Sequence, residues 1–287
     1  MIDSHTHIFP PEIRSDRDSY LERDPAFRIL YGSPRARLIG AGELIDQMDS
    51  SGIDCAVTFG FPWQDVDLMR RHNDYVGEAA SRFKGRLLPF VCVNPVLPGA
   101  AFEVERCLAA GMKGAGEIAC YDRSFGSDLS QYLLPIGSCC QSYDVPLMLH
   151  TNEEVGHQYP GKVMMPLKAM YEVVRSLPGT RFILAHWGGG LFFYELLKKE
   201  VREVLARVAY DTAASPFLYE SAIYAIALRI VGPKRILFGS DYPLISPQRY
   251  FIEMEEGGLS ESDMKWIKGD AAALWIGGQG AKESLIS

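Results

Sequence analysis

Residues 145–186 read VPLMLHTNEEVGHQYPGKVMMPLKAMYEVVRSLPGTRFILAH, and this stretch decides the fold. Two short apolar runs, VPLML at 145–149 and RFILA at 181–185, enclose a longer segment whose apolar residues have helical spacing. Alternation of apolar strands with amphipathic helices is typical of parallel sheets, because helices cover such strands. The stretch therefore predicts one strand, one helix and a second, parallel strand.

The same alternation recurs along the whole chain. Candidate strands lie at 1–7, 54–60, 87–93, 112–118, 145–150, 181–186, 206–211 and 235–241. Helical segments lie at 42–51, 67–83, 100–110, 129–143, 164–176, 192–205 and 218–231. Eight such units predict an α/β fold with a single (β/α)8 TIM barrel over residues 1–287. The alternative is an open doubly wound sheet, but no G-x-G-x-x-G turn follows the first strand.

Composition limits the partners of the protein. The chain has 287 residues and a net charge of −7, without the basic face that nucleic acid requires, so a small-molecule substrate is expected. No apolar run approaches the roughly 20 residues of a membrane span, and MIDSHTHIF does not resemble a signal peptide, so a cytoplasmic location is expected. The six cysteines form no C-x-x-C pair and are expected to be reduced. Assembly into a homo-oligomer is left open.

Metal-capable side chains stand where predicted strands end. His5 and His7 form an H-x-H pair on the first strand, and alternate residues of a strand share one face. His150 ends VPLMLH, His186 ends RFILAH and Asp241 ends RILFGSD. Because such groups are costly to bury unless they are paired or coordinated, their recurrence favours a metal site at one end of the barrel.

The segments HTHIFP, LMLH, ILAHWGGG and ILFGSDYP resemble motifs of the amidohydrolase superfamily, in particular its amidohydrolase-related branch, in the expected order. The resemblance implies a divalent metal at His5, His7, His150 and Asp241. It also implies that His186 orients substrate or water, or binds a second metal. No additional β-sandwich domain is expected, since the chain starts at the metal strand.

Glu117 has two interpretations. It stands where dinuclear relatives carry a carboxylated lysine, and GEIACYD resembles a segment of TatD-type deoxyribonucleases whose glutamate is a metal ligand. Glu117 is therefore a candidate metal ligand that could bridge two ions. The alternative is that its carboxylate orients a histidine ligand.

The ligand types favour zinc, with manganese or iron as alternatives, and one or two ions. A metal-bound hydroxide would attack the substrate, Asp241 would transfer protons, and His186 would polarise the scissile carbonyl or hold the water. Asp211, at the end of VAYD, is expected either to orient a neighbouring ligand or to cap the following helix.

The connections after strands supply candidate substrate contacts, because these loops lie on the catalytic face of a barrel. Trp63, His157 and Tyr159 are the candidates, whereas His72 on a helical segment is expected at the surface. The connection 8–40 carries several arginines that could clamp a substrate carboxylate. The alternative is that these arginines belong to a solvated surface segment.

The first expectation is a hydrolase of an amide, ester or lactone in a small molecule. One alternative is a non-oxidative decarboxylase of an aromatic or dienoic acid, which would need the arginine clamp. A TatD-like phosphodiesterase is a third possibility, disfavoured by the acidic charge balance. A barrel that binds metal without catalysis is the least favoured.

Overall fold

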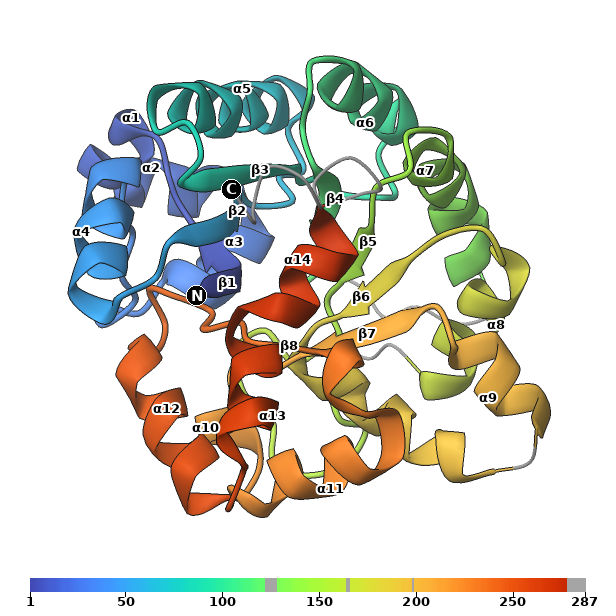
Figure 1. Ribbon diagram of the computed structural model, residues 1–287. Helices are drawn as coiled ribbons and strands as arrows, with labels where there is room; N and C mark the ends of the chain where they lie inside the picture. The colour runs from blue at the N-terminus through green and yellow to red at the C-terminus, as the bar shows by residue number, and fades with distance from the viewer. Residues whose placement is uncertain (122–127, 164–165, 198, 278–287) are drawn as a thin grey trace.

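The computed structural model describes residues 1–121, 128–163, 166–197 and 199–277. The parallel strands follow one another around a ring in chain order (Figure 1). They are β1 (Ile2–His7), β2 (Cys55–Phe59), β3 (Leu87–Val91), β4 (Gly114–Ile118), β5 (Leu147–Leu149), β6 (Phe182–Leu184), β7 (Val208–Asp211) and β8 (Ile236–Leu237). The last strand meets the first, since Ser4 N donates to the oxygen of Phe238 at 2.8 Å and Asp241 N donates to the oxygen of His5 at 2.9 Å. The predicted single (β/α)8 barrel is confirmed.

Helices cover the outside of the ring. They are α4 (Ala41–Ser51), α5 (Val66–Arg82), α6 (Ala100–Ala109), α7 (Leu129–Ser142), α8 (Leu167–Ser176), α9 (Lys199–Leu205), α11 (Ala222–Val231) and α12 (Pro247–Glu256). Residues 164 and 165 of the predicted helix 164–176 lie outside the described residues. None of the helices in the described ranges combines the length and hydrophobicity that a membrane crossing requires.

One predicted helix begins later than expected. In place of a helix over 192–205, a 3-10 segment runs over His186–Leu196 and α9 begins only at Lys199. Gly188, Gly189 and Gly190 have φ of 63°, 59° and 91°, a left-handed conformation that α-helices do not contain and that glycine adopts readily. The predicted helix 218–231 also begins late, at Ala222, after the short α10 (Ser215–Leu218).

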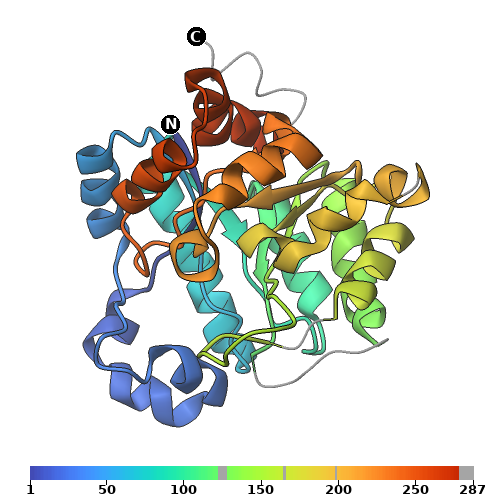
Figure 2. The same ribbon diagram turned by 90° about the horizontal axis from the view of Figure 1, so that it is seen from below.

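The two ends of the barrel differ. At one end α14 (Ala271–Ile276) lies across the ring, after α13 (Glu261–Lys265) and a π-helical turn (Trp266–Asp270). Its Trp275 packs in the same apolar cluster as Ile2 and Cys55, at the starts of their strands. The other end carries the long β1–α4 connection, which folds into α1 (Pro11–Ser15), α2 (Arg17–Arg23) and α3 (Pro25–Tyr31) (Figure 2).

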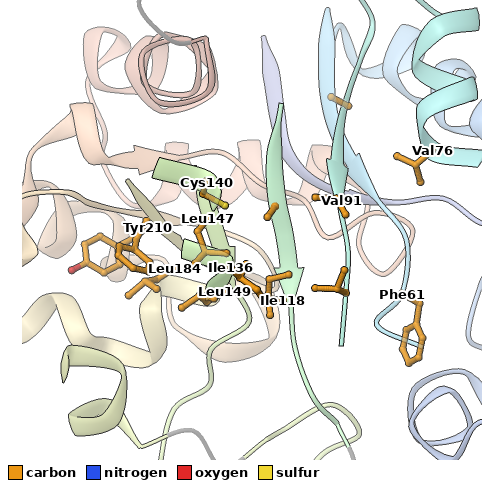
Figure 3. Packing of buried hydrophobic residues seen from close by; sticks show 14 of the residues in the cluster. Phe61, Val76, Val91, Ile118, Ile136, Cys140, Leu147, Leu149, Leu184 and Tyr210 are labelled. Atoms are coloured by element: carbon orange, nitrogen blue, oxygen red, sulfur yellow. The ribbon is translucent and has the colours of Figure 1, made fainter. Parts of the chain in front are cut away.

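Side chains alternate between two apolar clusters. Met148 and Ile183 belong to one cluster, whereas their neighbours Leu149 and Leu184 belong to the other, which includes Ile136 of α7 (Figure 3). This alternation follows from the two-residue repeat of a strand. Because both faces of the strands are buried, strands such as β5 (LML) and β6 (FIL) are apolar throughout, whereas β1 also buries Asp3 and Ser4.

Candidate metal centre

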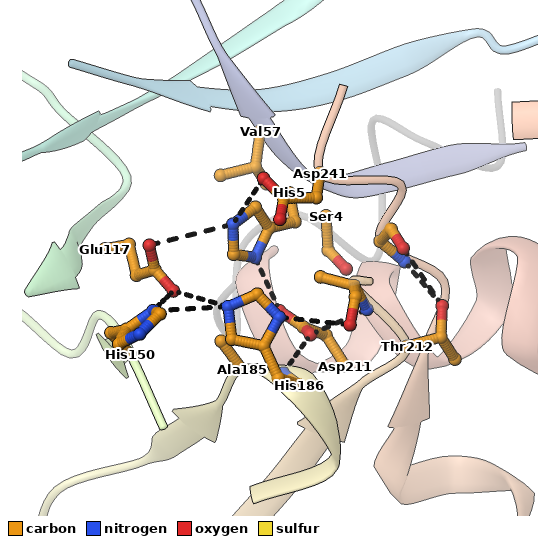
Figure 4. Close-up of polar contacts among 12 residues, drawn as sticks. Ser4, His5, Val57, Glu117, His150, Ala185, His186, Asp211, Thr212 and Asp241 are labelled. Atoms are coloured by element: carbon orange, nitrogen blue, oxygen red, sulfur yellow. Dashed lines mark hydrogen bonds and ion pairs between the residues drawn. The ribbon is translucent and has the colours of Figure 1, made fainter. Parts of the chain in front are cut away.

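Six side chains converge where the strands end, and Figure 4 shows five of them: His5, Glu117, His150, His186 and Asp241. They are His5 and His7 at the end of β1, Glu117 in β4, His150 directly after β5, His186 shortly after β6 and Asp241 after β8. His5, Glu117 and His186 are 0%, 3% and 5% exposed. Such burial of charged and imidazole groups requires partners for each of them.

Glu117 lies at the middle of this cluster. Its Oε1 is 2.9 Å from His150 Nδ1 and 3.2 Å from His186 Nε2, and these two nitrogens are 3.2 Å apart. Its Oε2 is 3.8 Å from His5 Nε2. The carboxylate therefore has one oxygen toward the His150 and His186 pair and the other toward β1.

Asp241 completes the side of the cluster that β1 forms. Its Oδ1 is 3.3 Å from His7 Nε2 and 3.7 Å from His5 Nε2. Both Asp241 and His186 have a positive φ, 56° and 55°, which residues other than glycine adopt at an energetic cost. The surrounding structure holds these two side chains at the site against that cost.

The donor atoms have the spacing of metal ligands. Two donors that each lie about 2.1 Å from a tetrahedral ion are roughly 3.4 Å apart. Three sets of donors within the described residues are close enough to share an ion: His5 with His7 and Glu117, His5 with His186 and Asp241, and Glu117 with His150 and His186. The four residues assigned to one ion from the sequence, His5, His7, His150 and Asp241, are divided among these sets, and Glu117 connects two of them.

The outer nitrogen of each imidazole fixes which nitrogen faces the cluster. His5 Nδ1 is 2.8 Å from Asp211 Oδ2, and His7, His150 and His186 each place their outer nitrogen next to a backbone carbonyl oxygen, at 3.4, 2.9 and 3.0 Å. Carboxylate and carbonyl oxygens accept, so the outer nitrogens carry the ring protons. Four lone pairs therefore face the carboxylates of Glu117 and Asp241, an arrangement that a cation between them would stabilise. His5 Nε2 is buried without a hydrogen-bond partner, as expected for an atom that binds metal.

Without a cation, protons take over part of its role. Burial disfavours a charged His5, but the carboxylates of Asp211 and Glu117 outweigh it and raise the pKa of His5 to about 10. Burial likewise opposes a charged His186, and its hydrogen bond to Glu117 raises the pKa to about 9. The pKa of Asp241 is lowered to about 2, because the hydrogen bond from His7 and the charge of His5 outweigh its burial. The cluster thus favours positive charge at its centre.

Asp211 orients two histidines. Besides accepting from His5 Nδ1, it accepts through Oδ1 from the backbone nitrogens of His186 and Ala213, at 2.9 and 3.0 Å. Of the two alternatives left open by the sequence, orientation of neighbouring ligands is the one observed. Asp3 was missed: its Oδ1 accepts from the backbone nitrogens of His5 and Ser240, at 3.1 and 2.9 Å. Strand alternation could have found it, since residues 3, 5 and 7 share a face.

A cavity of about 570 Å³ opens above the cluster. His7, Glu117, His150, His186 and Asp241 form part of its wall, as do His157 and Tyr159 from the predicted substrate loop. Arg35 and Arg37 of the β1–α4 connection also line it. The metal donors, the guanidinium groups of Arg35 and Arg37, and the predicted substrate loop therefore line one cavity.

Trp63 lies elsewhere than the sequence suggested. It is 0% exposed and is not part of the cavity wall, and its Nε1 donates to His72 Nδ1 at 2.9 Å. His72 was expected at the surface, and that prediction is wrong: it is fully buried, with Nε2 2.7 Å from the oxygen of Ile8. The neighbours Phe61 and Pro62 line the cavity instead. A strand-end position predicted the right loop but not which side chain turns inward.

Two tyrosines of the cavity wall were also missed. The hydroxyl of Tyr121 donates to Glu117 Oε2 at 3.4 Å, and its ring lies edge-on to His150 and stacked against Phe61. Tyr31, at the end of α3, lines the same cavity. Tyr121 is visible in GEIACYD, four residues after Glu117, whereas nothing in the sequence distinguishes Tyr31 from the other residues of its connection.

A barrel whose strand ends carry such donors is an enzyme scaffold of the metal-dependent class. The family model described as amidohydrolase matches residues 2–275, and the chain belongs to that family. The matched family confirms the resemblance of the strand-end motifs. The matched family and the structures named below are not of the TatD type, so GEIACYD remains the sole support for that resemblance.

Comparison with solved structures gives relatives of the same fold. The 5-carboxyvanillate decarboxylase of Novosphingobium aromaticivorans DSM 12444, with bound manganese and 3-methoxy-4-hydroxy-5-nitrobenzoic acid, has a TM-score of 0.75 at 19% identity over 96% of each chain. The dihydroxybenzoic acid decarboxylase of Polaromonas sp. JS666, with manganese and 2-nitroresorcinol, has 0.69 at 20% identity over 96% of each chain. A putative 2-pyrone-4,6-dicarboxylic acid hydrolase of Pseudomonas putida has 0.63 at 16% identity, over 96% of this chain and 97% of the other. No curated protein matches the sequence.

Proposed function

We propose that the protein is a metal-dependent decarboxylase of an aromatic acid, the alternative rather than the first expectation from the sequence. The observation that carries this proposal is the presence of Arg35 and Arg37 in the same cavity as the metal donors. A decarboxylase must hold a carboxylate, and guanidinium groups bind carboxylates through paired hydrogen bonds. The decarboxylases named above, which share the fold, support the choice.

The cavity wall suits a planar ring. Tyr31, Phe61 and Tyr121 are neighbours there, with Phe61 and Tyr121 stacked at 14° between ring planes. Aromatic side chains favour offset stacking or edge contacts with another ring. Arg37 also contacts Tyr242, the residue after Asp241, with a nitrogen 3.2 Å from its hydroxyl. We therefore assign ring binding to this aromatic wall and anion binding to Arg35 and Arg37, with His157 and Tyr159 as further substrate contacts.

In this reaction the bond between the ring carbon and the carboxyl carbon breaks, carbon dioxide leaves, and the electron pair left on the ring carbon takes a proton. A bound divalent cation would supply a Lewis acid for the oxygens of the substrate. Asp241 borders both His7 and the cavity and is ionised, since its pKa is lowered to about 2, so its carboxylate would take a proton from solvent water and pass it to the ring carbon. His186 would orient the substrate from the opposite side of Glu117.

Manganese is the metal we propose, because two relatives bind it and the donors are imidazoles and carboxylates, although zinc fits the same donors. With two ions per chain, Glu117 would be a ligand to both; with one ion, its carboxylate would hold the nitrogens of His150 and His186 in place. Metal analysis of the purified protein, with Glu117→Gln as the comparison, distinguishes these roles. Cytoplasmic location and homo-oligomer formation stay predictions.

The test is incubation of the manganese-loaded protein with 5-carboxyvanillate and 2,6-dihydroxybenzoate, with release of carbon dioxide as the measurement. Arg37→Gln is expected to raise KM strongly. Arg23→Gln is the matched control, since Arg23 lies in the same connection but pairs with Asp65 outside the cavity wall. Equal effects of the two substitutions, or no carbon dioxide from any aromatic acid tried, would contradict the proposal.

Hydrolysis of a lactone is the second candidate. The observation that favours it is Glu117, whose two oxygens face two sets of donors, an arrangement suited to a bridged pair of ions that activates water. The putative 2-pyrone-4,6-dicarboxylic acid hydrolase supports it as well. Incubation with 2-pyrone-4,6-dicarboxylate separates the candidates, because hydrolysis adds water to the substrate whereas decarboxylation removes carbon dioxide.

A further inference from the structure

The loop after β5 holds His150 from behind. His150 Nε2 lies 2.9 Å from the carbonyl oxygen of Gly161 and 2.9 Å from Asn152 Oδ1. The orientation of the Asn152 amide is fixed independently, because the backbone nitrogen of Val163 donates to the same Oδ1 at 2.8 Å. Both neighbours of Nε2 are therefore acceptors, and Nε2 carries the proton. His150 is left with the Nδ1 lone pair directed at Glu117, 2.9 Å away.

Asn152 is in turn held by a chain of hydrogen bonds that reaches the cavity wall. Its Nδ2 donates to the hydroxyl oxygen of Tyr159 at 3.1 Å, and that hydroxyl donates to Glu153 Oε2 at 2.9 Å. Lys162 Nζ is 3.0 Å from Glu153 Oε1, and the side chain of Lys162 is only 1% exposed. Every donor in the chain points toward Glu153, whose charge Lys162 balances. The side chains of Asn152, Tyr159, Glu153 and Lys162 thus form one connected polar network within the loop.

We infer that Asn152 is a positioning residue for the metal centre. Asn152 holds the imidazole of His150 with Nδ1 toward the cation, and Tyr159 in turn holds Asn152. The inference rests on the proposed role of His150 as a metal ligand. Partners behind a metal-binding imidazole fix its orientation, and their loss typically weakens metal binding about 10- to 100-fold. Because Tyr159 also lines the cavity, the same network joins the substrate wall to the metal centre.

The experiment measures the dissociation constant of Mn²⁺ and the visible spectrum of the Co²⁺-loaded protein. Asn152→Ala is expected to raise the Mn²⁺ dissociation constant by about tenfold or more and to change the Co²⁺ spectrum. Asn152→Asp keeps an acceptor at the same place but loses the Nδ2 donor to Tyr159, so it is expected to bring the Mn²⁺ dissociation constant back to within about threefold of that of the unmodified protein. Asn94→Ala is the matched control: Asn94 follows β3 in the same way, is buried, and accepts from Val96 N within its own loop. It should bind Mn²⁺ as the unmodified protein does.

Two results would count against the inference in different ways. Wild-type Mn²⁺ binding by Asn152→Ala, together with loss of binding in His150→Ala, overturns the role of Asn152 and leaves the metal site intact. Wild-type binding by His150→Ala overturns the metal site itself. Should Asn152→Ala fail to fold, Tyr159→Phe removes the acceptor of Asn152 Nδ2 together with the donor to Glu153, and is expected to weaken Mn²⁺ binding about threefold with an altered Co²⁺ spectrum. An unchanged affinity and spectrum in Tyr159→Phe would then overturn the inference.

Discussion

Two histidines with different partners, His7 and His72, lie beside Gly60. On one side His7 places Nδ1 3.4 Å from the carbonyl oxygen of Gly60, and on the other a Cβ at Gly60 would lie 2.8 Å from the ring of His72. His7 belongs to the cluster with Glu117 and Asp241. His72 accepts from Trp63 Nε1 at Nδ1 and donates from Nε2 to the oxygen of Ile8. The side chain of His7 is 13% exposed and His72 is fully buried, and of these two His7 is the one that faces a carboxylate.

The comparison indicates that partners, rather than burial, distinguish a candidate metal ligand among these histidines. Burial lowers the pKa of His72 to about 4, since no carboxylate offsets it, and both ring nitrogens are paired in the neutral form. Carboxylates outweigh the same burial at His5 and raise its pKa to about 10. A neutral histidine with both nitrogens paired needs no cation. A histidine whose lone pair faces a carboxylate needs a cation, either a metal ion or a proton, between the two groups.

The largest effect is expected from removing a histidine of the cluster. His150→Ala should abolish turnover, a loss beyond the roughly 100- to 1,000-fold that a single catalytic hydrogen bond contributes, because the site loses a metal donor. His72→Gln should retain its metal and most of its turnover. Metal content and kcat of the two variants are the measurements. Equal metal loss in both would erase the distinction between the two environments.

The second-largest effect, a loss of stability, is expected when the metal is removed. A cation bound at about 1,000 times its dissociation constant stabilises the native state by about 4 kcal/mol, so dialysis against a chelator should lower Tm by about 10 °C. The shift should be the same size in His72→Gln, since His72 does not contact the cluster, and absent in His150→Ala. Calorimetry with and without Mn²⁺ checks this. A chelator-sensitive Tm in His150→Ala would show that metal binds elsewhere.

The sequence predicted the barrel and the six converging side chains because both depend on regular patterns. Strand alternation and apolar runs repeat along the chain, and a polar residue that ends each run is visible as an exception. The environment of Trp63 and His72 could not be predicted, because it depends on which way one loop turns after β2. The helical position of His72 suggested solvent, whereas Ile8 and Phe9 after β1 and Trp63 after β2 contact it. Tyr31 was hidden for the same reason, since its helix had no counterpart in the strand repeat.

The pH dependence of stability should report His72. Its pKa in the folded protein, about 4, lies below the ordinary value of 6.5, so the unfolded chain binds more protons between these values. The stabilisation is complete above pH 6.5 and is lost as the pH falls toward 4, by about 3 kcal/mol from this group. His72→Gln should lack that part of the decline. Urea unfolding of both proteins at pH 7 and pH 4.5, each with excess chelator, measures it, and parallel declines would contradict the assigned burial.

The smallest effect on stability is expected at His157, a third kind of histidine. It is exposed at the cavity wall, and Lys162 Nζ contacts only its backbone oxygen, at 3.2 Å, so truncating the side chain removes no described hydrogen bond. His157→Ala should change the free energy of unfolding by no more than about 0.5 kcal/mol and leave the Mn²⁺ content unchanged. Its effect should appear in KM alone, because the imidazole borders the substrate space without contacting the metal donors. A fall in kcat at unchanged KM would instead assign His157 a part in the chemical step. Exposure would then be a poorer guide than hydrogen-bond partners to which histidines of this barrel act in catalysis.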